Sequence, residues 1–417
     1  MFRINIYLNF YKFLKAIFFF KSKDQLEKSI SKLILTQTKK RKLIFASLCR
    51  VSFLYILKFF KKENPNKNEI IFSSYNLPEM INVAKNLGFN IKYCDIDYKT
   101  GFFDYKKLKK LKSKKTIAIV LTNMFNDFKE AKKIKTFSKK YKINLIEDNA
   151  IYFDNFSKVG KKKYYSGSIG DFSIYSFNIM KNISAMYGGA LATNNLKFIK
   201  FYEKETKDKK SFFKILLLKQ ISIYLILKTM SIGLLYNLFF KYLIKLSHKN
   251  NLKILLKIFY PSLKFRIINF PEYYFTSISR LSLKLIYLQL KDLDERINNF
   301  NLRKTKNIYY HNSLKKIKNK NLKLININDF NYQNFIDYPI LVKDKQKLNE
   351  FLLDNGIEVR YIYYRNCEKI FKTKQFKCKN SNLYEEQLIC LPNHQKVNFD
   401  YIDKMVSYIQ IFLKQNK

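Results

Sequence analysis

The 417-residue sequence has few glycines and prolines, no tryptophan and few acidic residues: 9 Gly, 6 Pro and 32 Asp+Glu against 80 Lys+Arg. The resulting formal net charge of +48 raises the question of nucleic-acid binding. However, the lysines are spread along the whole chain among Asn, Ile, Phe and Tyr, which indicates a compositional bias of A+T-rich codons. We therefore expect no nucleic-acid partner. An anionic substrate or a membrane surface would benefit from such a field.

Cysteine and histidine are also scarce. The five cysteines form no C-x-x-C pair, which argues against a zinc knuckle and a thioredoxin motif. Their odd number, without disulfide-like spacing, suits a reducing compartment, so we expect a cytoplasmic protein. The three histidines are far apart in the sequence, and no metal site is expected.

A secretory signal is not evident at the N-terminus. Residues 1–20 are mostly apolar, but Lys12 and Lys15 interrupt the apolar run and no small-residue cleavage site follows it. An amphipathic first helix is the better interpretation.

Apolar strand-like runs alternate with helical patterns through the first half of the chain. This spacing predicts an α/β fold with a mainly parallel sheet and crossover helices. A long helix over 281–298 then leads to a smaller α+β unit, which has strands at 335–342 and 357–362. We expect a large domain over 1–295 and a small C-terminal domain over 296–417.

Residues 211–260 form an apolar helical insertion into this pattern. Between Gln220 and Phe240 only Lys228 is charged, and this length could span a bilayer. Lysines nevertheless recur every several residues, which favours helices lying on a membrane surface or packed on a partner. A soluble core insertion and a true membrane span remain the alternatives.

Two strand ends carry the residues with chemical potential. The run Ile143–Ile146 ends in Glu147-Asp148, and the run Phe172–Phe177 leads into a loop that carries Lys181. In parallel sheets, ligands bind at the carboxyl ends of strands. Considered alone, an aspartate after a strand more often belongs to a turn or caps a helix. A single lysine does not indicate a site, because lysine is so common in this sequence.

Together these residues suit pyridoxal phosphate. A lysine amine can bind the aldehyde covalently, a carboxylate can pair with the pyridine nitrogen, and hydroxyls with backbone N–H groups can hold the phosphate. Lys181, Asp148 and Ser176 supply the side chains, and the Ser47–Arg50 turn, with Cys49, supplies a phosphate-binding segment. Glycines are needed where the lysine loop passes its neighbours, and Gly188-Gly189 provide them.

The motifs I-E-D-N-A (146–150) and G-D-F-S-I-Y-S-F-N-I-M-K-N-I-S-A-M-Y-G-G-A (170–190) resemble those of the DegT/DnrJ/EryC1/StrS family of sugar aminotransferases. The similarity extends to C-D-I-D-Y (94–98), Y-L-Q-L-K-D-L-D-E (287–295) and L-I-C-L-P-N-H (388–394). The resemblance implies a fold-type-I pyridoxal-phosphate enzyme that works as a homodimer. It also implies transfer of an amino group, from glutamate, to a keto-sugar nucleotide in amino-sugar or surface-polysaccharide biosynthesis.

The resemblance assigns Lys181 as the cofactor lysine, Asp148 as the partner of the pyridine nitrogen and Ser176 as a phosphate ligand. The family's phosphate turn is usually Ser-Gly-Thr or Ser-Gly-Arg; here Cys49 replaces the glycine and Arg50 follows it. Ile151 stands where the family often has a glutamine. Leu77 stands where the family has the aromatic residue that covers the cofactor ring, and Tyr75 is nearby. The asparagine that a neighbouring subunit supplies in the family is not evident near Phe275.

These departures keep a second hypothesis open, in which the chain is a non-catalytic homologue that binds a membrane or partner through 211–260. A third hypothesis is a sugar dehydratase of the same family. That branch replaces the lysine with histidine, and Lys181 argues against it.

Overall fold

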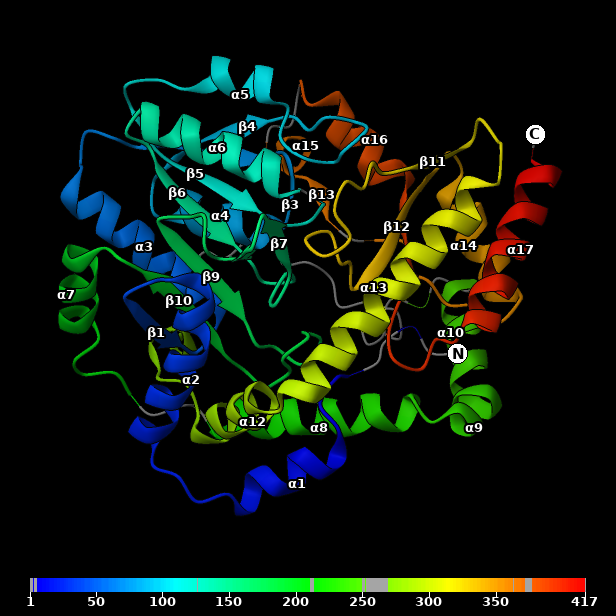
Figure 1. The fold of residues 1–417 in the computed structure, drawn as a ribbon, viewed down its shortest axis with the longest axis horizontal. Coiled ribbons are helices and arrows are strands. Elements are labelled where there is room, and N and C mark those ends of the chain that lie inside the picture. The colour runs from blue at the N-terminus through cyan, green and yellow to red at the C-terminus, as the bar shows by residue number, and fades with distance from the viewer. Residues whose placement is uncertain are drawn as a thin grey trace.

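The central element of the computed structural model is a seven-stranded sheet in the order β1-β10-β9-β6-β5-β2-β4 (Figure 1). The structure describes residues 3, 6–125, 127–210, 214–249, 252, 269–362, 364–371 and 377–416. Strands β4, β2, β5, β6 and β9 run parallel, and β10 is antiparallel to both β9 and β1. The strands are β1 (Lys42–Ala46), β2 (Glu69–Ser73), β4 (Asn90–Cys94), β5 (Thr116–Thr122), β6 (Asn144–Asp148), β9 (Phe172–Ser176) and β10 (Gly189–Thr193). This sheet confirms the predicted α/β class.

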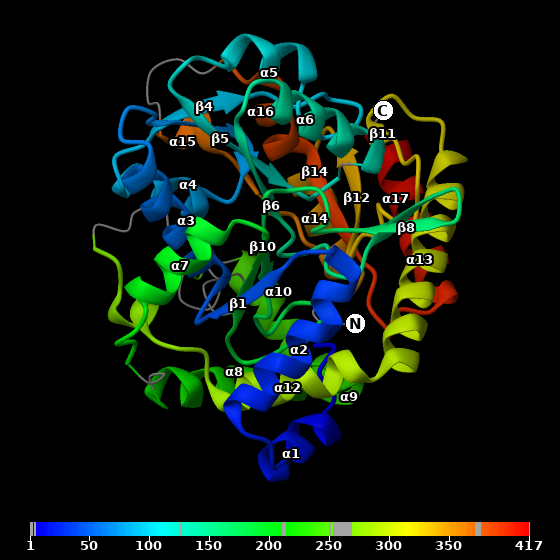
Figure 2. The same cartoon turned by 60° about the vertical axis from the view of Figure 1, so that its left-hand side comes forward.

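Helices cover both faces of the sheet because its strands alternate apolar side chains between them (Figure 2). On one face Ile70 and Phe72 join a core with α3, α4 and α7, whereas Ile71 joins a core with α5 and α6 on the other. At the β9–β10 end, α2 and α12 supply the cover. The helices are α2 (Lys23–Thr38), α3 (Cys49–Glu63), α4 (Pro78–Asn86), α5 (Tyr105–Leu111), α6 (Phe128–Lys140), α7 (Leu196–Glu205) and α12 (Arg280–Lys291).

The linker helix breaks earlier than the sequence suggested. A continuous helix over 281–298 was wrong: α12 ends at Lys291 and α13 (Leu293–Lys315) begins after Asp292. The Asp292 side chain caps the new helix by accepting from the Glu295 N–H, with 3.2 Å between oxygen and nitrogen. The cap therefore fixes a bend where the apolar periodicity alone predicted continuity.

The C-terminal part is built on a second, three-stranded sheet in the order β11-β12-β14. The predicted strand at 357–362 was wrong, since this segment is extended and makes only an isolated bridge between Arg360 and Cys390. Strand β14, which pairs with β12, carries Cys390 at this bridge. The elements are β11 (Leu322–Leu324), β12 (Asp337–Val342), α14 (Lys345–Asp354), β13 (Arg365–Asn366), α15 (Cys367–Phe371), α16 (Lys379–Gln387), β14 (Leu388–Pro392) and α17 (Phe399–Gln415).

Strand β13 pairs with β3 (Tyr75–Asn76), which lies in the part of the chain that forms the large sheet. This pair ties the C-terminal part to the region just before α4, which lies beside the phosphate-binding segment predicted at 47–50. A second small pair, β7 (Phe156–Val159) with β8 (Lys162–Tyr165), forms a hairpin after β6.

The predicted insertion forms helices as far as it is described. They are α8 (Lys214–Met230), α9 (Gly233–Leu235), the π-helix η1 (Tyr236–Phe240) and α10 (Lys241–Lys249). Residues 211–213, 250–251 and 253–260 of the insertion lie outside the described residues. A 3₁₀ helix, η2 (Glu272–Phe275), precedes α12. The predicted amphipathic N-terminal helix is α1 (Phe10–Phe18), which packs on α12.

Candidate functional site

Strand pairing brings the predicted phosphate-binding segments together. Gly189 of β10 lies opposite Ala46 of β1 on one side and Ser176 of β9 on the other. Ser47 follows Ala46 directly, so Ser47 and Ser176 emerge at the same edge of the sheet. β1, β9 and β6 all run in one direction, and their carboxyl ends therefore meet at this edge.

The N-terminus of α3 at this edge is suited to an anion. No side chain caps it, since the N-cap residue is Leu48. The Ser47 hydroxyl beside it is fully buried and has no hydrogen-bond partner in the described structure. A helix N-terminus presents backbone N–H groups and a positive dipole end, so a phosphate placed here would also satisfy the orphan hydroxyl. This local chemistry fits the phosphate of the cofactor.

Glycine is required at residue 189 because α3 begins against it. A Cβ built on Gly189 would lie 2.3 Å from the Cys49 nitrogen and 2.3 Å from the Leu48 carbonyl carbon. Both contacts are with backbone atoms, which cannot move aside as a flexible side chain would. The glycine predicted to shape the lysine loop therefore also sets how closely the phosphate-binding turn approaches β10.

The two acidic residues at the end of β6 have different roles. Glu147 is fully buried and accepts from the N–H groups of Gly167, Ile169 and Gly170 at 2.7–3.0 Å. It is therefore committed to holding the loop before β9. The buried carboxylate of Asp148 accepts a hydrogen bond from the Ala150 N–H at 3.0 Å. Burial raises the pKa of Asp148, while that N–H and Lys181 oppose the rise.

Lys181 lies in a buried environment beside Asp148. Burial lowers the pKa of Lys181 to about 8, with the carboxylate of Asp148 acting in the opposite direction and Arg360 and Arg50 reinforcing it. The Cys49 thiol is also close, and burial raises its pKa well above the ordinary value. A lysine that sheds its proton near pH 8 can act as a nucleophile and as a proton carrier. The structure thus assembles Lys181, Asp148, Cys49 and Arg50 around one place.

The loop that carries Lys181 is fixed at three points. Asn182 Nδ2 donates to the Phe153 carbonyl at 2.9 Å, which links this loop to the segment after Asp148. Gln289 of α12 accepts from the Ser184 N–H at 3.0 Å and donates to the Ser184 carbonyl at 2.7 Å. The loop is closed on itself where the Lys181 N–H donates to the Asn178 carbonyl at 3.0 Å.

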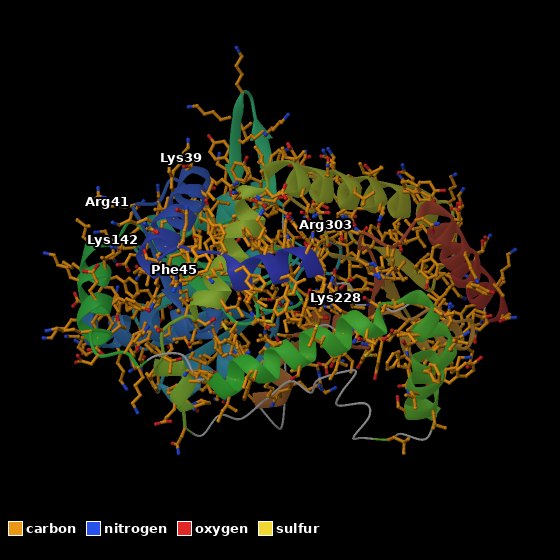
Figure 3. The ribbon with its side chains drawn as sticks, turned by 90° about the horizontal axis from the view of Figure 1, so that it is seen from below. Lys39, Arg41, Phe45, Lys142, Lys228 and Arg303 are labelled. Carbon is orange, nitrogen blue, oxygen red and sulfur yellow. The ribbon has the colours of Figure 1, made fainter. Side chains whose placement is uncertain are left out.

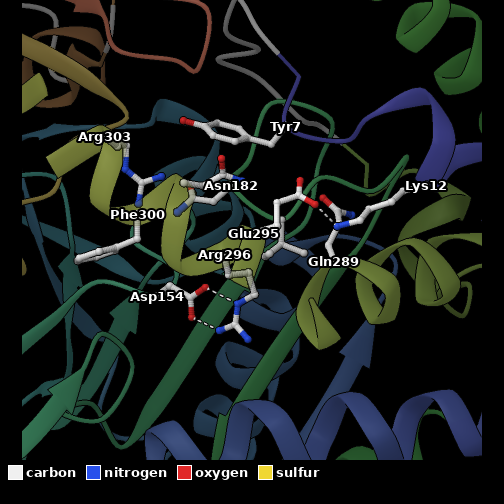
Figure 4. A pocket seen from close by; sticks show the side chains of 11 residues that line it. Tyr7, Lys12, Asp154, Asn182, Gln289, Glu295, Arg296, Phe300 and Arg303 are labelled. Carbon is white, nitrogen blue, oxygen red and sulfur yellow. Dashed lines mark hydrogen bonds and ion pairs between the residues drawn. The ribbon is translucent and has the colours of Figure 1, made fainter. Parts of the chain in front are cut away.

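A small cavity of about 30 Å³ lies behind this loop (Figure 4). Asn182 lines it together with Arg303 and the ion pair between Asp154 and Arg296. The Tyr7 hydroxyl, which also faces the cavity, has no hydrogen-bond partner in the described structure. The volume suits one or two water molecules, so we assign this cavity to the support of the lysine loop and not to a substrate.

Arg50 is partly committed to neighbours of its own chain. Its Nη1 lies 2.5 Å from Glu79 Oε2, and Tyr274 of η2 lies close enough to influence its pKa. Tyr274 adjoins Phe275, the position where the family resemblance implied an asparagine from a partner. The prediction that Arg50 contacts the phosphate remains untested, and the Glu79 pair is a competing role for the same guanidinium.

Two residues near the lysine were missed from the sequence. Arg360 lies close enough to lower the pKa of Lys181, and its Nη2 is 3.1 Å from Asp337 Oδ2. Tyr364 is half-buried near Asp148 and Cys49, and its N–H donates to the Tyr75 hydroxyl at 3.3 Å. The basic and aromatic run R-Y-I-Y-Y (360–364) was a usable signal, but residues 357–362 were predicted to be a strand.

Comparisons with known proteins place these observations in context. A family model described as the DegT/DnrJ/EryC1/StrS aminotransferase family matches residues 38–204 and 277–410. The unmatched stretch between them contains the helical insertion.

Curated relatives match parts of the chain. A UDP-4-amino-4,6-dideoxy-N-acetyl-beta-L-altrosamine transaminase of Helicobacter pylori is 25% identical over 180 residues, which is 42% of this chain and 46% of the relative. The transaminase with the same name from Campylobacter jejuni is 34% identical over 121 residues, 28% of this chain and 31% of the relative. The matched part thus spans less than half the length of these relatives.

Solved structures match almost the whole fold. Helicobacter pylori PseC, an aminotransferase of pseudaminic acid biosynthesis, has a TM-score of 0.70 at 16% identity, covering 97% of this chain and 96% of that chain. An Escherichia coli GDP-4-keto-6-deoxy-D-mannose-3-dehydratase with bound hydrated PLP has a TM-score of 0.67 at 17% identity, covering 97% and 99%. At such identities the likeness establishes the fold.

Proposed function

Because the chain belongs to the DegT/DnrJ/EryC1/StrS aminotransferase family, we propose that it is a pyridoxal-phosphate-dependent aminotransferase acting on a keto-sugar nucleotide. The observation that carries the proposal is the half-buried Lys181 with its lowered pKa, set beside the buried Asp148 at the strand ends where the sheet has an uncapped helix N-terminus. Lys181 argues against a dehydratase of the branch that has histidine at this position.

The residues divide the binding of the cofactor between them. Lys181 would hold its aldehyde carbon, Asp148 would pair with its ring nitrogen, and Ser47, Ser176 and the N-terminus of α3 would hold its phosphate. When bound, the cofactor supplies the electron sink that makes the Cα proton of an amino acid removable. The negative charge of Asp148 keeps the ring nitrogen protonated, which that function requires.

Lys181 would act a second time once the donor had displaced it. Its amine would take the proton from Cα of the donor as a general base and then release it as a general acid. A pKa near 8 keeps a sizeable fraction of the amine neutral at physiological pH. In the second half of the reaction the same amine would deliver a proton to the sugar carbon that receives the amino group.

Substrates follow from the relatives and from charge. The names of the Helicobacter and Campylobacter relatives describe transaminases of UDP-sugars, and a diphosphate suits a chain of net charge +48. We propose glutamate as the donor, with the Arg360 guanidinium supplying a cation for a carboxylate near Lys181. The product would be an amino sugar for a surface polysaccharide.

We also propose that the enzyme is a homodimer in the cytoplasm, with peripheral contact at the inner face of the membrane through the 211–260 insertion. The dimer rests on the family resemblance, and the compartment on the buried free thiols. Light scattering of the purified protein measures its oligomeric state, and a monomeric mass at micromolar concentration would contradict the dimer.

The function is tested by incubating the purified protein with pyridoxal phosphate, glutamate and a UDP-4-keto sugar. We expect equal amounts of 2-oxoglutarate and aminated nucleotide sugar by mass spectrometry, and neither with Lys181→Ala. Absence of both products from protein that has taken up the cofactor would support the non-catalytic alternative instead.

A further inference from the structure

More than half of the large apolar side chains that are exposed on the described residues belong to two segments. The first is α1 with the residues just after it, and the second runs from α8 to α10. In the first segment they are Phe10, Tyr11, Leu14, Ile17, Phe18 and Phe20. In the second they include Ile215, Leu218, Ile226, Leu234, Phe239 and Tyr242. Exposed apolar patches of this extent mark interaction sites in folded proteins.

The two segments form one surface. The Phe13 and Tyr224 rings lie 5.0 Å apart, between α1 and α8. Lys228 Nζ of α8 donates to the Ile6 carbonyl at 2.9 Å, just before α1. Figure 1 places both helices along the lower side of the molecule, and Figure 3 shows them adjacent when that side is viewed directly. We call this area the α1–α8 surface.

The α1–α8 surface is basic and has no acidic residue in its sequence. Residues 1–23 and 209–271 contain lysines and arginines but no aspartate or glutamate. Lys15, Lys214 and Lys219 are exposed beside the apolar side chains. The carboxylates beside it, Asp292, Glu295 and Asp354, already pair with Lys12 and Lys245. If two copies met through this surface in a two-fold dimer, its exposed lysines would face one another. The charge therefore complements an anionic surface and opposes self-association.

A lysine-lined groove of about 400 Å³ adjoins the α1–α8 surface, between the insertion and the C-terminal part of the chain. Lys241 contributes from α10, Lys396 from the loop after β14, and Lys404 from α17. Tyr401 also lines the groove, and Lys396 Nζ donates to the Ser231 carbonyl at its edge. Three ammonium groups form a suitable site for a phosphate.

We propose that the α1–α8 surface docks on a bilayer containing anionic phospholipid, and that the groove of Lys241, Lys396 and Lys404 receives a lipid headgroup phosphate. This deepens the peripheral membrane contact proposed above and does not depend on catalysis. The helices lie in the interface with their exposed apolar side chains in the lipid and their lysines at the headgroups.

An interfacial arrangement fits the helix geometry. Among the described residues no single helix is long and apolar enough to cross a membrane, and Lys214–Met230 with Gly233–Ser247 meets that criterion only as a pair bent by 78°. In α8, Tyr224, Leu227 and Met230 are buried against the rest of the protein. A helix that uses one side to pack on its own chain has only the other side for lipid.

Sedimentation with vesicles tests the proposal. The full-length protein should pellet with vesicles of phosphatidylcholine and phosphatidylglycerol, and much less with phosphatidylcholine alone. Binding should weaken steeply with added salt but not with inorganic phosphate at matched ionic strength. Equal binding to both vesicle types, or release by inorganic phosphate, would contradict an anionic lipid ligand.

Variants separate the two parts of the surface. The triple change Lys241→Ala, Lys396→Ala and Lys404→Ala should weaken vesicle binding roughly 100-fold, at about one kcal/mol per lysine. The double change Phe18→Asp and Phe239→Asp should abolish it. These side chains are exposed, so circular dichroism and cofactor uptake should be unchanged.

Matched controls use exposed residues elsewhere. Lys106→Ala, Lys109→Ala and Lys110→Ala remove the same charge from α5, and Leu196→Asp with Ile411→Asp adds the same acids to α7 and α17. Vesicle binding should fall no more than about threefold in either control variant. An equal loss in the controls, or a change of oligomeric state instead of vesicle binding in the Phe18/Phe239 variant, would overturn the proposal.

Discussion

At the residue scale, the account depends on the amine of Lys181. Burial favours the neutral amine, so the pKa of about 8 lies below the ordinary lysine value of about 10.4. Between these two pH values the unfolded chain binds more protons than the folded chain, and apoprotein stability therefore rises with pH across that window. The neutral, nucleophilic fraction rises over the lower part of the same window.

We therefore expect the rate of cofactor capture by apoprotein to rise with pH to a plateau, with a midpoint near 8. Stopped-flow absorbance measures this rate. In Asp148→Asn the carboxylate that raises the lysine pKa is gone, and the midpoint should fall below that of the wild type. A midpoint near 10, or an upward shift in the variant, would show that Lys181 is not buried beside Asp148.

Gly189 allows a second prediction at this scale. Gly189→Ala places a methyl group 2.3 Å from the Cys49 nitrogen, and the required movement of α3 should destabilise the protein by about 1–3 kcal/mol and weaken cofactor binding. Thermal unfolding and cofactor titration measure both effects. Gly233→Ala is the matched control because a Cβ there has no neighbour within 4 Å, and it should be neutral or slightly stabilising. Equal behaviour of the two variants would refute the steric requirement.

At the element scale, α12 holds the lysine loop through Gln289. In Gln289→Leu the buried N–H and C=O of Ser184 would both lose their partner, at a cost of about 1–3 kcal/mol. We expect a lower unfolding midpoint and faster cofactor dissociation, measured by fluorescence after dilution. Gln346→Leu on the exposed face of α14 is the control and should change neither. Unchanged cofactor dissociation in Gln289→Leu would mean that the clamp does not position the loop.

Helices and strands with strong local patterns could be predicted from the sequence. Strands β2, β5 and β6 were predictable because they are short apolar runs ending in polar residues, and α6 because Asp127 caps it and lysines close it. The site residues Asp148 and Lys181 were predictable because each follows such a strand.

Features that depend on tertiary pairing were not predictable. The 357–362 segment has strand-like composition, but it pairs with β14 only at the single bridge between Arg360 and Cys390. The break at Asp292 was marked in the sequence by Asp followed three residues later by Glu, a capping signal that the apolar periodicity obscured. Arg360 is placed by its bridge to Cys390 of β14, and Tyr364 precedes β13, which pairs with β3; neither pairing is visible in the sequence.

At the scale of the whole molecule, two separate parts of the sequence produce the α1–α8 surface. The N-terminal helix and the insertion are about 200 residues apart in the sequence, and only the fold brings Phe13 against Tyr224. Because the charge on this surface has one sign, we expect cell fractionation to release the protein from membranes at high salt. Deletion of the insertion alone should leave weaker, residual binding through α1. Complete retention at high salt would indicate a spanning segment instead.

The central claim is that Lys181 binds pyridoxal phosphate, and its most direct test is chemical. The purified protein is incubated with the cofactor, reduced with borohydride, digested and analysed by peptide mass spectrometry. The account predicts a visible absorbance band that reduction removes, with the pyridoxyl group on the peptide that contains Lys181 and absent in Lys181→Ala. A colourless protein that cannot be reconstituted, or a label distributed over other lysines, would contradict it.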